Sequence, residues 1–161
     1  DLLSDSGAAQ LADENGMLPL HYACAFGAES EVVQVLGEVF PESLQSVDNK
    51  GRTPLHFCMG NASNDSSPGM VELLLTLDAA TGHHERESDR LVNKVDGDGH
   101  LPLTLIASQA RSLGPEPKSL RENTCSCLTV YLDHRPLPSA DFLAALQTVP
   151  DWLCDRALVN V

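Results

Sequence analysis

Apolar residues recur at helical intervals in three separate stretches of the chain. Residues spaced by three, four or seven positions lie on one face of an α-helix. Each stretch therefore predicts a helix that buries one face. The residues concerned are Val32, Leu36, Val39 and Phe40, then Val71, Leu74 and Leu75, and then Leu128, Tyr131 and Leu132.

A shorter motif precedes each stretch and occurs three times, at 13–23, 48–58 and 96–106. Each copy has Asp, then Gly three residues later, and Pro-Leu at the sixth and seventh positions after the Asp. Asp-x-x-Gly favours a tight turn because Gly adopts a positive φ. Pro suits the first position of a helix because its missing N–H is not needed there. The repeating unit is therefore a turn, a short helix and a second helix.

The motif prolines Pro19, Pro54 and Pro102 lie 35 and 48 residues apart. These intervals suit a repeat of about 33 residues that carries insertions. Thr53 precedes the second proline and is expected to cap its helix with the hydroxyl, worth about 1 kcal/mol over alanine. Leucine stands at the same place in the other two copies, at 18 and 101, so those helix starts are expected to be weaker.

The frame resembles the ankyrin repeat, whose core motif is Thr-Pro-Leu-His-x-Ala. The second copy matches over 53–56, and the first matches over 19–23 with leucine in place of the threonine. The third copy departs further, because Leu101 and Thr104 replace Thr and His. Val92-Asn93 matches the family's Val-Asn dipeptide before the turn. The resemblance covers residues 1–135, approximately.

The resemblance implies an all-α ankyrin-repeat solenoid of helix-turn-helix units joined by β-hairpin-like turns. A single domain is expected over 1–161. Its parts would be the end of a partial repeat (1–12), three repeats with insertions (13–47, 48–95 and 96–135) and a helical C-terminal cap (136–161). Within the cap, Ser139 is expected to be the N-cap of a helix over 140–149.

Three polar stretches interrupt the period, at 60–69, 78–90 and 111–121. Their composition predicts loops. Two interpretations stay open. They are tolerated surface insertions, since lengthening a loop costs little free energy, or they form a lobe that contacts a partner, since long loops often carry function.

The charge balance narrows the class of partner. The 161-residue chain has 23 acidic and 10 basic residues, a net charge of −13. Such a surface repels phosphate backbones and anionic lipids, which argues against nucleic-acid binding and direct membrane insertion. Aromatic residues make up 4%, too few for a base-stacking platform. The partner is expected to present a basic or apolar surface.

Cysteine usage and hydropathy bear on the compartment. Five cysteines, an odd number, do not suit a secreted disulfide framework, so reduced thiols and a cytoplasmic location are expected. No apolar run approaches the ~18 residues that span a bilayer, and no signal peptide opens the chain. Because the sequence starts at Asp1, it is expected to be part of a longer protein, and membrane tethering through flanking sequence stays open.

Several residues invite a metal or acid-base interpretation. The resemblance implies that His21 and His56 make structural hydrogen bonds between turns and helices. His83-His84 lies in a polar insertion, where a solvated loop is expected. Cys125 and Cys127 would point about 200° apart on a helix, so one helix cannot direct both at one metal.

The remaining motifs give no catalytic arrangement. Asp96-Gly-Asp-Gly99 is similar to the start of a calcium loop, but Ala107 stands where the bidentate Glu is needed. Cys24 and Cys58 align with alanines and are expected in the core. There is no phosphate-binding loop and no nucleophile elbow in the sequence. We expect no enzyme activity, no metal and no cofactor.

The resemblance implies a scaffold that binds another protein through its turn tips and concave helical face. Phe26, Met17 and Arg52 are expected to be the anchors. One alternative is a regulatory segment of a larger enzyme or membrane protein, bound by another domain of the same chain. A second is a metal or redox protein using Cys125, Cys127 and His83-His84. The full set of expected contacts is Asn15, Met17, Ala25, Phe26, Lys50, Arg52, Asn61, Asp98, His100 and Gln109.

Overall fold

The computed structural model describes residues 6–62, 67–82, 86, 89–113, 118–134 and 138–153. These residues form helices and turns, with no strand among them. Two 3-10 helices, η1 (Pro41–Leu44) and η3 (Leu91–Asn93), follow α3 and α5. The α-helices are α1 (Ser6–Ala9), α2 (Pro19–Ala25), α3 (Ser30–Val39), α4 (Pro54–Gly60), α5 (Pro68–Thr81), α6 (Pro102–Leu113), α7 (Lys118–Asp133) and α8 (Ala140–Gln147).

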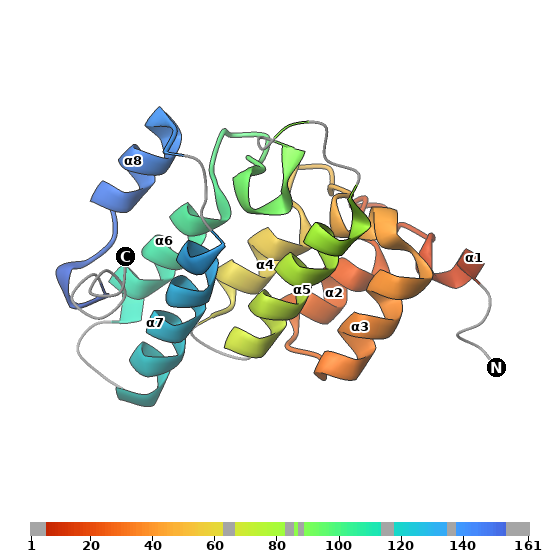
Figure 1. Cartoon of the computed structure of the whole chain (residues 1–161), viewed down its shortest axis with the longest axis horizontal. Coiled ribbons are helices and arrows are strands. Elements are labelled where there is room, and N and C mark those ends of the chain that lie inside the picture. The colour runs from red at the N-terminus through yellow and green to blue at the C-terminus, as the bar shows by residue number, and fades with distance from the viewer. Residues whose placement is uncertain are drawn as a thin grey trace.

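The helices lie in two rows (Figure 1). An inner row contains α2, α4 and α6 and is continued by α8, which contacts α6. An outer row contains α3, α5 and α7, and α1 contacts α3 at its start. Each inner helix also contacts the outer helix that follows it in the chain. The arrangement confirms the predicted all-α solenoid. No helix among the described residues is long and apolar enough to span a membrane.

The predicted helix starts are confirmed. Pro19, Pro54 and Pro102 are the first residues of α2, α4 and α6, where a missing N–H breaks no helical hydrogen bond. The hydroxyl of Ser139 accepts the backbone N–H of Phe142 at 3.1 Å and caps α8, although this helix ends at 147 and not at 149. Local sequence signals therefore place these four helix starts correctly.

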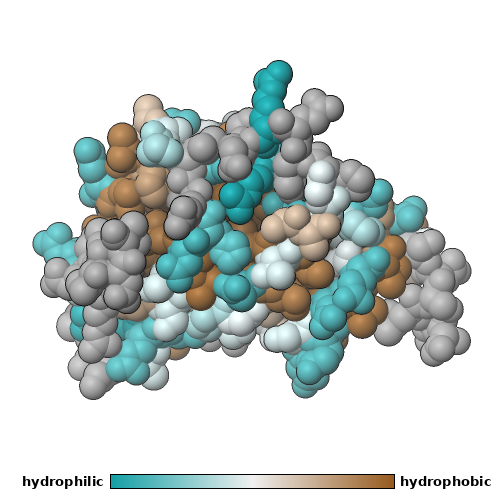
Figure 2. Space-filling model, in the orientation of Figure 1, coloured by the Kyte–Doolittle hydropathy of each residue, from teal (hydrophilic) through white to brown (hydrophobic). Residues whose placement is uncertain are grey.

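The predicted buried face of α3 is wrong at Val32, whereas Leu36 is half-buried and packs against the core as predicted. Val32 is 46% exposed, whereas Val33 and Gly37 are buried. Gly37 is a core position because a Cβ there would lie only 3.0 Å from Cδ1 of Leu77, a side chain of α5. A glycine carries no apolar signal, so the apolar periodicity did not place Gly37 in the core. Figure 2 shows hydrophilic side chains along the outward side of α3. The predicted faces of α5 and α7 are confirmed, with Val71, Leu74, Leu75, Leu128, Tyr131 and Leu132 all buried.

The predicted loops are shorter than their polar composition suggested. α4 continues to Gly60 and α5 begins at Pro68, while 111–113 and 118–121 belong to α6 and α7. α5 also continues to Thr81, and Asp78 within it is buried. Its carboxylate accepts hydrogen bonds from Nε2 of Gln45 at 2.6 Å and from the backbone N–H of Leu91 at 2.8 Å. A polar residue in this stretch therefore anchors two connecting segments to the helix.

Candidate partner-binding surface

The three predicted turns share one hydrogen-bonding pattern. In the second turn, Oδ1 of Asp48 accepts the backbone N–H groups of Lys50 and Arg52 at 2.9 and 2.8 Å. Asp13 and Asp96 accept the corresponding two N–H groups at the same distances. The turn glycines have φ between 74° and 82°. Each aspartate therefore fixes its own turn, and the residues two and four positions later project from it.

The turns stack into a single row through backbone hydrogen bonds. The N–H of Asn49 donates to the carbonyl of Asn15 at 2.8 Å, and the N–H of Gly97 donates to the carbonyl of Lys50 at 2.8 Å. The side chains of Asn15, Lys50 and Asp98 are exposed. Three of the predicted contact residues therefore lie at equivalent places on consecutive turns.

Two buried histidines hold the turns against the inner helices. Nδ1 of His21 and of His56 accepts the backbone N–H just before its own helix, at Leu18 (3.0 Å) and Thr53 (3.1 Å). Nε2 of His21 lies 3.1 Å from the carbonyl of Ser46 and 3.2 Å from that of Arg52. The hydroxyl of Thr53 lies 2.8 Å from Nδ1 of His56, so it forms a hydrogen bond with the imidazole ring.

The next turn is reached in the same way by His56, whose Nε2 lies 3.0 Å from the carbonyl of His100. A carbonyl only accepts, so Nε2 carries the proton and Nδ1 is left as the acceptor for the helix start. These bonds need neutral imidazoles. The structural role implied for both histidines by the resemblance matches this geometry.

We expect the free energy of unfolding to fall as the pH drops below 6.5. Burial lowers the pKa of His21 and of His56 below the ordinary value of 6.5. The hydrogen bonds to the carbonyls of Arg52 and His100, and the charges of Asp48 and Asp96, partly oppose this lowering. The unfolded chain then binds more protons than the folded chain. The contribution of the two neutral histidines to stability is therefore fully present above pH 6.5 and is lost as the pH falls from 6.5 toward their lowered pKa values.

For two full protons the slope is at most about 2.7 kcal/mol per pH unit. Urea unfolding followed by circular dichroism between about pH 7.5 and 5, above the main carboxylate range, measures this slope. A His56→Gln variant should show a shallower slope. A flat profile for the unchanged chain would contradict the neutral-histidine assignment.

The predicted contact residues at or near the ends of α2, α4 and α6 differ in how far their side chains are exposed. Phe26 is 73% exposed. Asn61 occupies the equivalent place in the next repeat, but its side-chain amide donates to the carbonyl of Ala25 at 2.8 Å. Ala25 and Gln109 are half-buried. Of these four predicted contacts, Phe26 offers the largest exposed apolar surface.

The predicted anchor Arg52 is already engaged within the chain. Its Nε and Nη2 donate to Oδ2 of Asp48 at 2.9 and 2.6 Å. Its guanidinium also lies over the ring of Phe57, 4.4 Å from the centroid. Since the side chain is still 31% exposed, part of it faces solvent. Met17 is half-buried and His100 is exposed.

Sequence reasoning missed Tyr22. Its ring stacks on that of Phe26, with centroids 6.2 Å apart and planes at 6°, and its hydroxyl donates to Asp13 at 2.6 Å. The tyrosine thus connects the exposed phenylalanine to the first turn. The i, i+4 spacing of two aromatic residues on a short helix was the signal that could have identified the pair.

The family model for ankyrin repeats in three copies matches residues 1–85. The chain belongs to the ankyrin-repeat family. A search of the curated proteins gives no match. Ankyrin repeats are generally protein-interaction modules and are typically non-catalytic. Beyond residue 85, the turn at 96–100 and the pair α6 and α7 continue the ankyrin arrangement in space.

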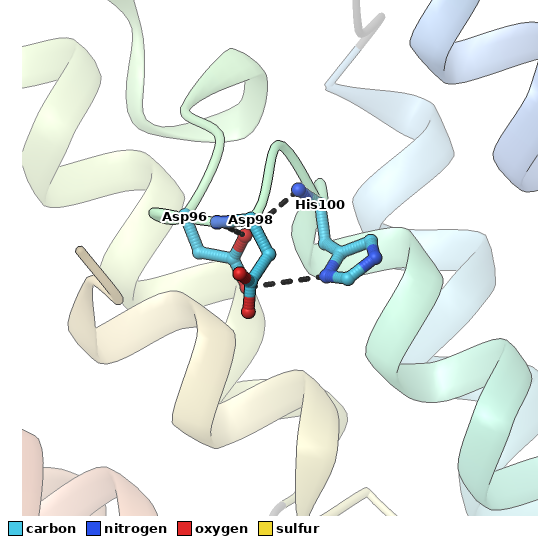
Figure 3. A group of neighbouring side chains, drawn as sticks. All are labelled: Asp96, Asp98 and His100. Carbon is cyan, nitrogen blue, oxygen red and sulfur yellow. Dashed lines mark hydrogen bonds and ion pairs between the residues drawn. The ribbon is translucent and has the colours of Figure 1, made fainter. Parts of the chain in front are cut away.

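One group of possible metal ligands lies on the third ankyrin turn (Figure 3). Ligand atoms of Asp96, Asp98 and His100 lie within 4.8 Å of one another. Nδ1 of His100 is 3.5 Å from Oδ2 of Asp96, while Oδ1 of Asp96 accepts the two turn N–H groups. The other two turns have the same hydrogen-bonding pattern, with Asp13, Asn15 and Met17 or Asp48, Lys50 and Arg52 at these three positions. The turn geometry alone therefore accounts for this grouping.

The cysteines among the described residues are buried and form no disulfide with one another: Cys24, Cys58, Cys125 and Cys127. Burial raises the pKa of the Cys127 thiol to about 12 and raises that of Cys24, chiefly by desolvation. A thiol with a raised pKa is a poor nucleophile and a poor metal ligand at neutral pH. The geometry thus favours a packing role for these four residues. His83, His84 and Cys154 lie outside the described residues.

Proposed function

We propose that this ankyrin-repeat chain is a non-catalytic scaffold that binds a partner protein through its row of turn tips and through Phe26. The observation that carries the proposal is the stacking of three equivalent turns in one row, which presents Asn15, Lys50 and Asp98 side by side. A preorganised row of exposed side chains loses little entropy on binding, and solenoids of this kind use such extended surfaces for recognition.

The partner is proposed to bring a basic or apolar face. The net charge of −13 opposes an acidic partner, and exposed carboxylates lie on the first and third turns at Asp13, Glu14 and Asp98. Phe26 supplies the apolar part of the surface. The alternative predicted from the sequence is that another domain of the same polypeptide binds this surface. A cytoplasmic location is proposed on the odd cysteine count.

The proposed surface is tested by three substitutions combined: Met17→Ala, Phe26→Ala and Lys50→Ala. Arg52 is left unchanged because it also holds the second turn through Asp48. Partner proteins captured by the unchanged chain are quantified by mass spectrometry, and the triple variant is expected to recover them at least about tenfold less.

The matched control places three substitutions on the exposed side of α3, Glu31→Ala, Gln34→Ala and Glu38→Ala. Capture by this control should match the unchanged chain when all three proteins have the same circular dichroism spectrum. Equal capture by the triple variant and the unchanged chain would refute the surface.

A further inference from the structure

The first turn contains the only Asn-Gly sequence of the 161-residue chain, Asn15-Gly16. The backbone nitrogen of a residue that follows asparagine can attack the side-chain carbonyl carbon and close a five-membered ring. Glycine has no Cβ to hinder this approach, so the ring closes most readily at Asn-Gly. The equivalent positions in the other two turns hold Lys50 and Asp98, so the first turn alone places an amide there.

The side chain of Asn15 is open to water. It is exposed, and so are the side chains of Lys50 and Asp98 at the equivalent places. Lys50 lies between two stacked turns, since the N–H of Asn49 bonds to the first turn and the carbonyl of Lys50 accepts the N–H of Gly97. The exposure is therefore a property of this position in the turn, and it does not depend on where the row of turns ends.

The attacking nitrogen is held by a hydrogen bond within its own turn. The N–H of Gly16 donates to the carbonyl of Asp13 at 3.0 Å. The amide of Asn15 also stays beside this turn, because its Nδ2 donates to Oδ2 of Asp13 at 3.2 Å. Opening of a surface turn costs about as much free energy as the hydrogen bonds that it breaks. A brief opening of the first turn is therefore enough for the ring to close.

The two Asp-Gly sequences of the third turn, Asp96-Gly97 and Asp98-Gly99, offer the same ring closure with a poorer carbonyl group. An ionised carboxylate repels a nucleophile, whereas a neutral side-chain amide does not. At the first of these sequences, Oδ1 of Asp96 accepts two turn N–H groups and the N–H of Gly97 donates to the second turn at 2.8 Å. We therefore expect the first turn to react before Asp98, and Asp98 before Asp96.

We propose that Asn15-Gly16 is a site of spontaneous deamidation and backbone isomerisation in the folded chain, with water as the reactant. The nitrogen of Gly16 gives up its proton to hydroxide and forms a bond to Cγ of Asn15. The Cγ–Nδ2 bond breaks, and Nδ2 leaves as ammonia after taking a proton from water. A second water then opens the ring: attack at Cγ gives aspartate, and attack at the main-chain carbonyl gives isoaspartate, in which the chain continues through Cγ.

Both products change the first turn. In the aspartate product an oxygen replaces the Nδ2 donor beside Oδ2 of Asp13, so a hydrogen bond becomes a contact between like charges. In the isoaspartate product, the main-chain carbonyl of Asn15 that accepts the N–H of Asn49 becomes a free carboxylate, and the main chain gains one carbon. Either product adds one negative charge to the net charge of −13. The reaction involves this chain and water alone, so it does not rest on the proposed function.

The site is tested by ageing the whole chain at mildly alkaline pH beside a peptide of residues 11–20, the unfolded reference. Mass spectrometry of digests follows deamidation, and protein isoaspartyl methyltransferase labels isoaspartate. We expect conversion at Asn15 in the folded chain, about tenfold slower than in the peptide because the turn must first open. Over the same period Asp98 should convert less than Asn15, and Asp96 least.

Three variants test the contribution of the turn. Asn15→Gln keeps an amide but requires a six-membered ring, which closes far more slowly, so it should abolish conversion. Asn49→Ala removes the 2.9 Å bond from Nδ2 of Asn49 to the carbonyl of Glu14 and should speed conversion by about two- to tenfold. Gly99→Ala strains the third turn, where φ is +82°, and should leave the rate at the first turn unchanged.

Three results would overturn the inference. One is unchanged Asn15 in the folded chain after the peptide has converted completely, since the turn would then protect the site. Another is faster formation of isoaspartate at Asp98 than at Asn15. The third is acceleration by Gly99→Ala as large as that by Asn49→Ala, since the reaction would then proceed through global unfolding and not through opening of the first turn.

Discussion

Replacing Gly51 with alanine is expected to lower the free energy of unfolding by about 3 to 4 kcal/mol. Gly51 has φ +74°, a conformation that costs an L-residue about 1 to 2 kcal/mol. A Cβ there would also lie 2.5 Å from the backbone nitrogen of Gly97. That nitrogen donates the 2.8 Å hydrogen bond to Lys50 that joins the second and third turns, so the bond must lengthen or break.

Gly99 provides a matched control within the same chain. It occupies the equivalent place in the third turn with φ +82°, but a Cβ there would meet nothing within 4 Å. Gly99→Ala should therefore lose only the conformational part, about 1 to 2 kcal/mol. Urea unfolding of both variants measures the difference. Equal losses would show that the contact between the turns contributes nothing to stability.

The second large effect is expected from His56→Ala, a loss of about 3 to 4 kcal/mol in the free energy of unfolding. The side chain is fully buried, so its removal leaves a cavity. It also leaves the N–H of Thr53 and the carbonyl of His100 without the ring that bonds to both. Because one ring joins the start of α4 to the third turn, both are expected to loosen together.

His100→Ala is the control for this substitution. The His100 side chain is exposed, and its contact with Asp96 is long, at 3.5 Å. Its loss should change the free energy of unfolding by no more than about 0.5 kcal/mol. The same unfolding measurement applies, and amide hydrogen exchange at 53–60 reports the loosening directly. A loss below about 1 kcal/mol for His56→Ala would contradict the bridging role.

The amino-acid sequence by itself determined the repeat, the turns and the helix starts. These depend on interactions within a few residues: Gly51 allows the turn, Pro54 suits the first turn of its helix, and Ser139 supplies a capping oxygen. The sequence also indicated the family, since the Asp-x-x-Gly turn followed by Pro-Leu occurs three times along the chain. Nothing in these signals required a contact between distant residues.

Only the tertiary structure decided which residues are available on the surface. Gly37 became a core position because Leu77 approaches it from another helix, and Asp78 became buried because Gln45 and Leu91 bond to it. Asn61 and Phe26 look equivalent along the chain, but the first bonds to the preceding helix while the second meets solvent. Burial depends on which residues from distant parts of the chain pack against a side chain, and a local sequence pattern does not contain that information.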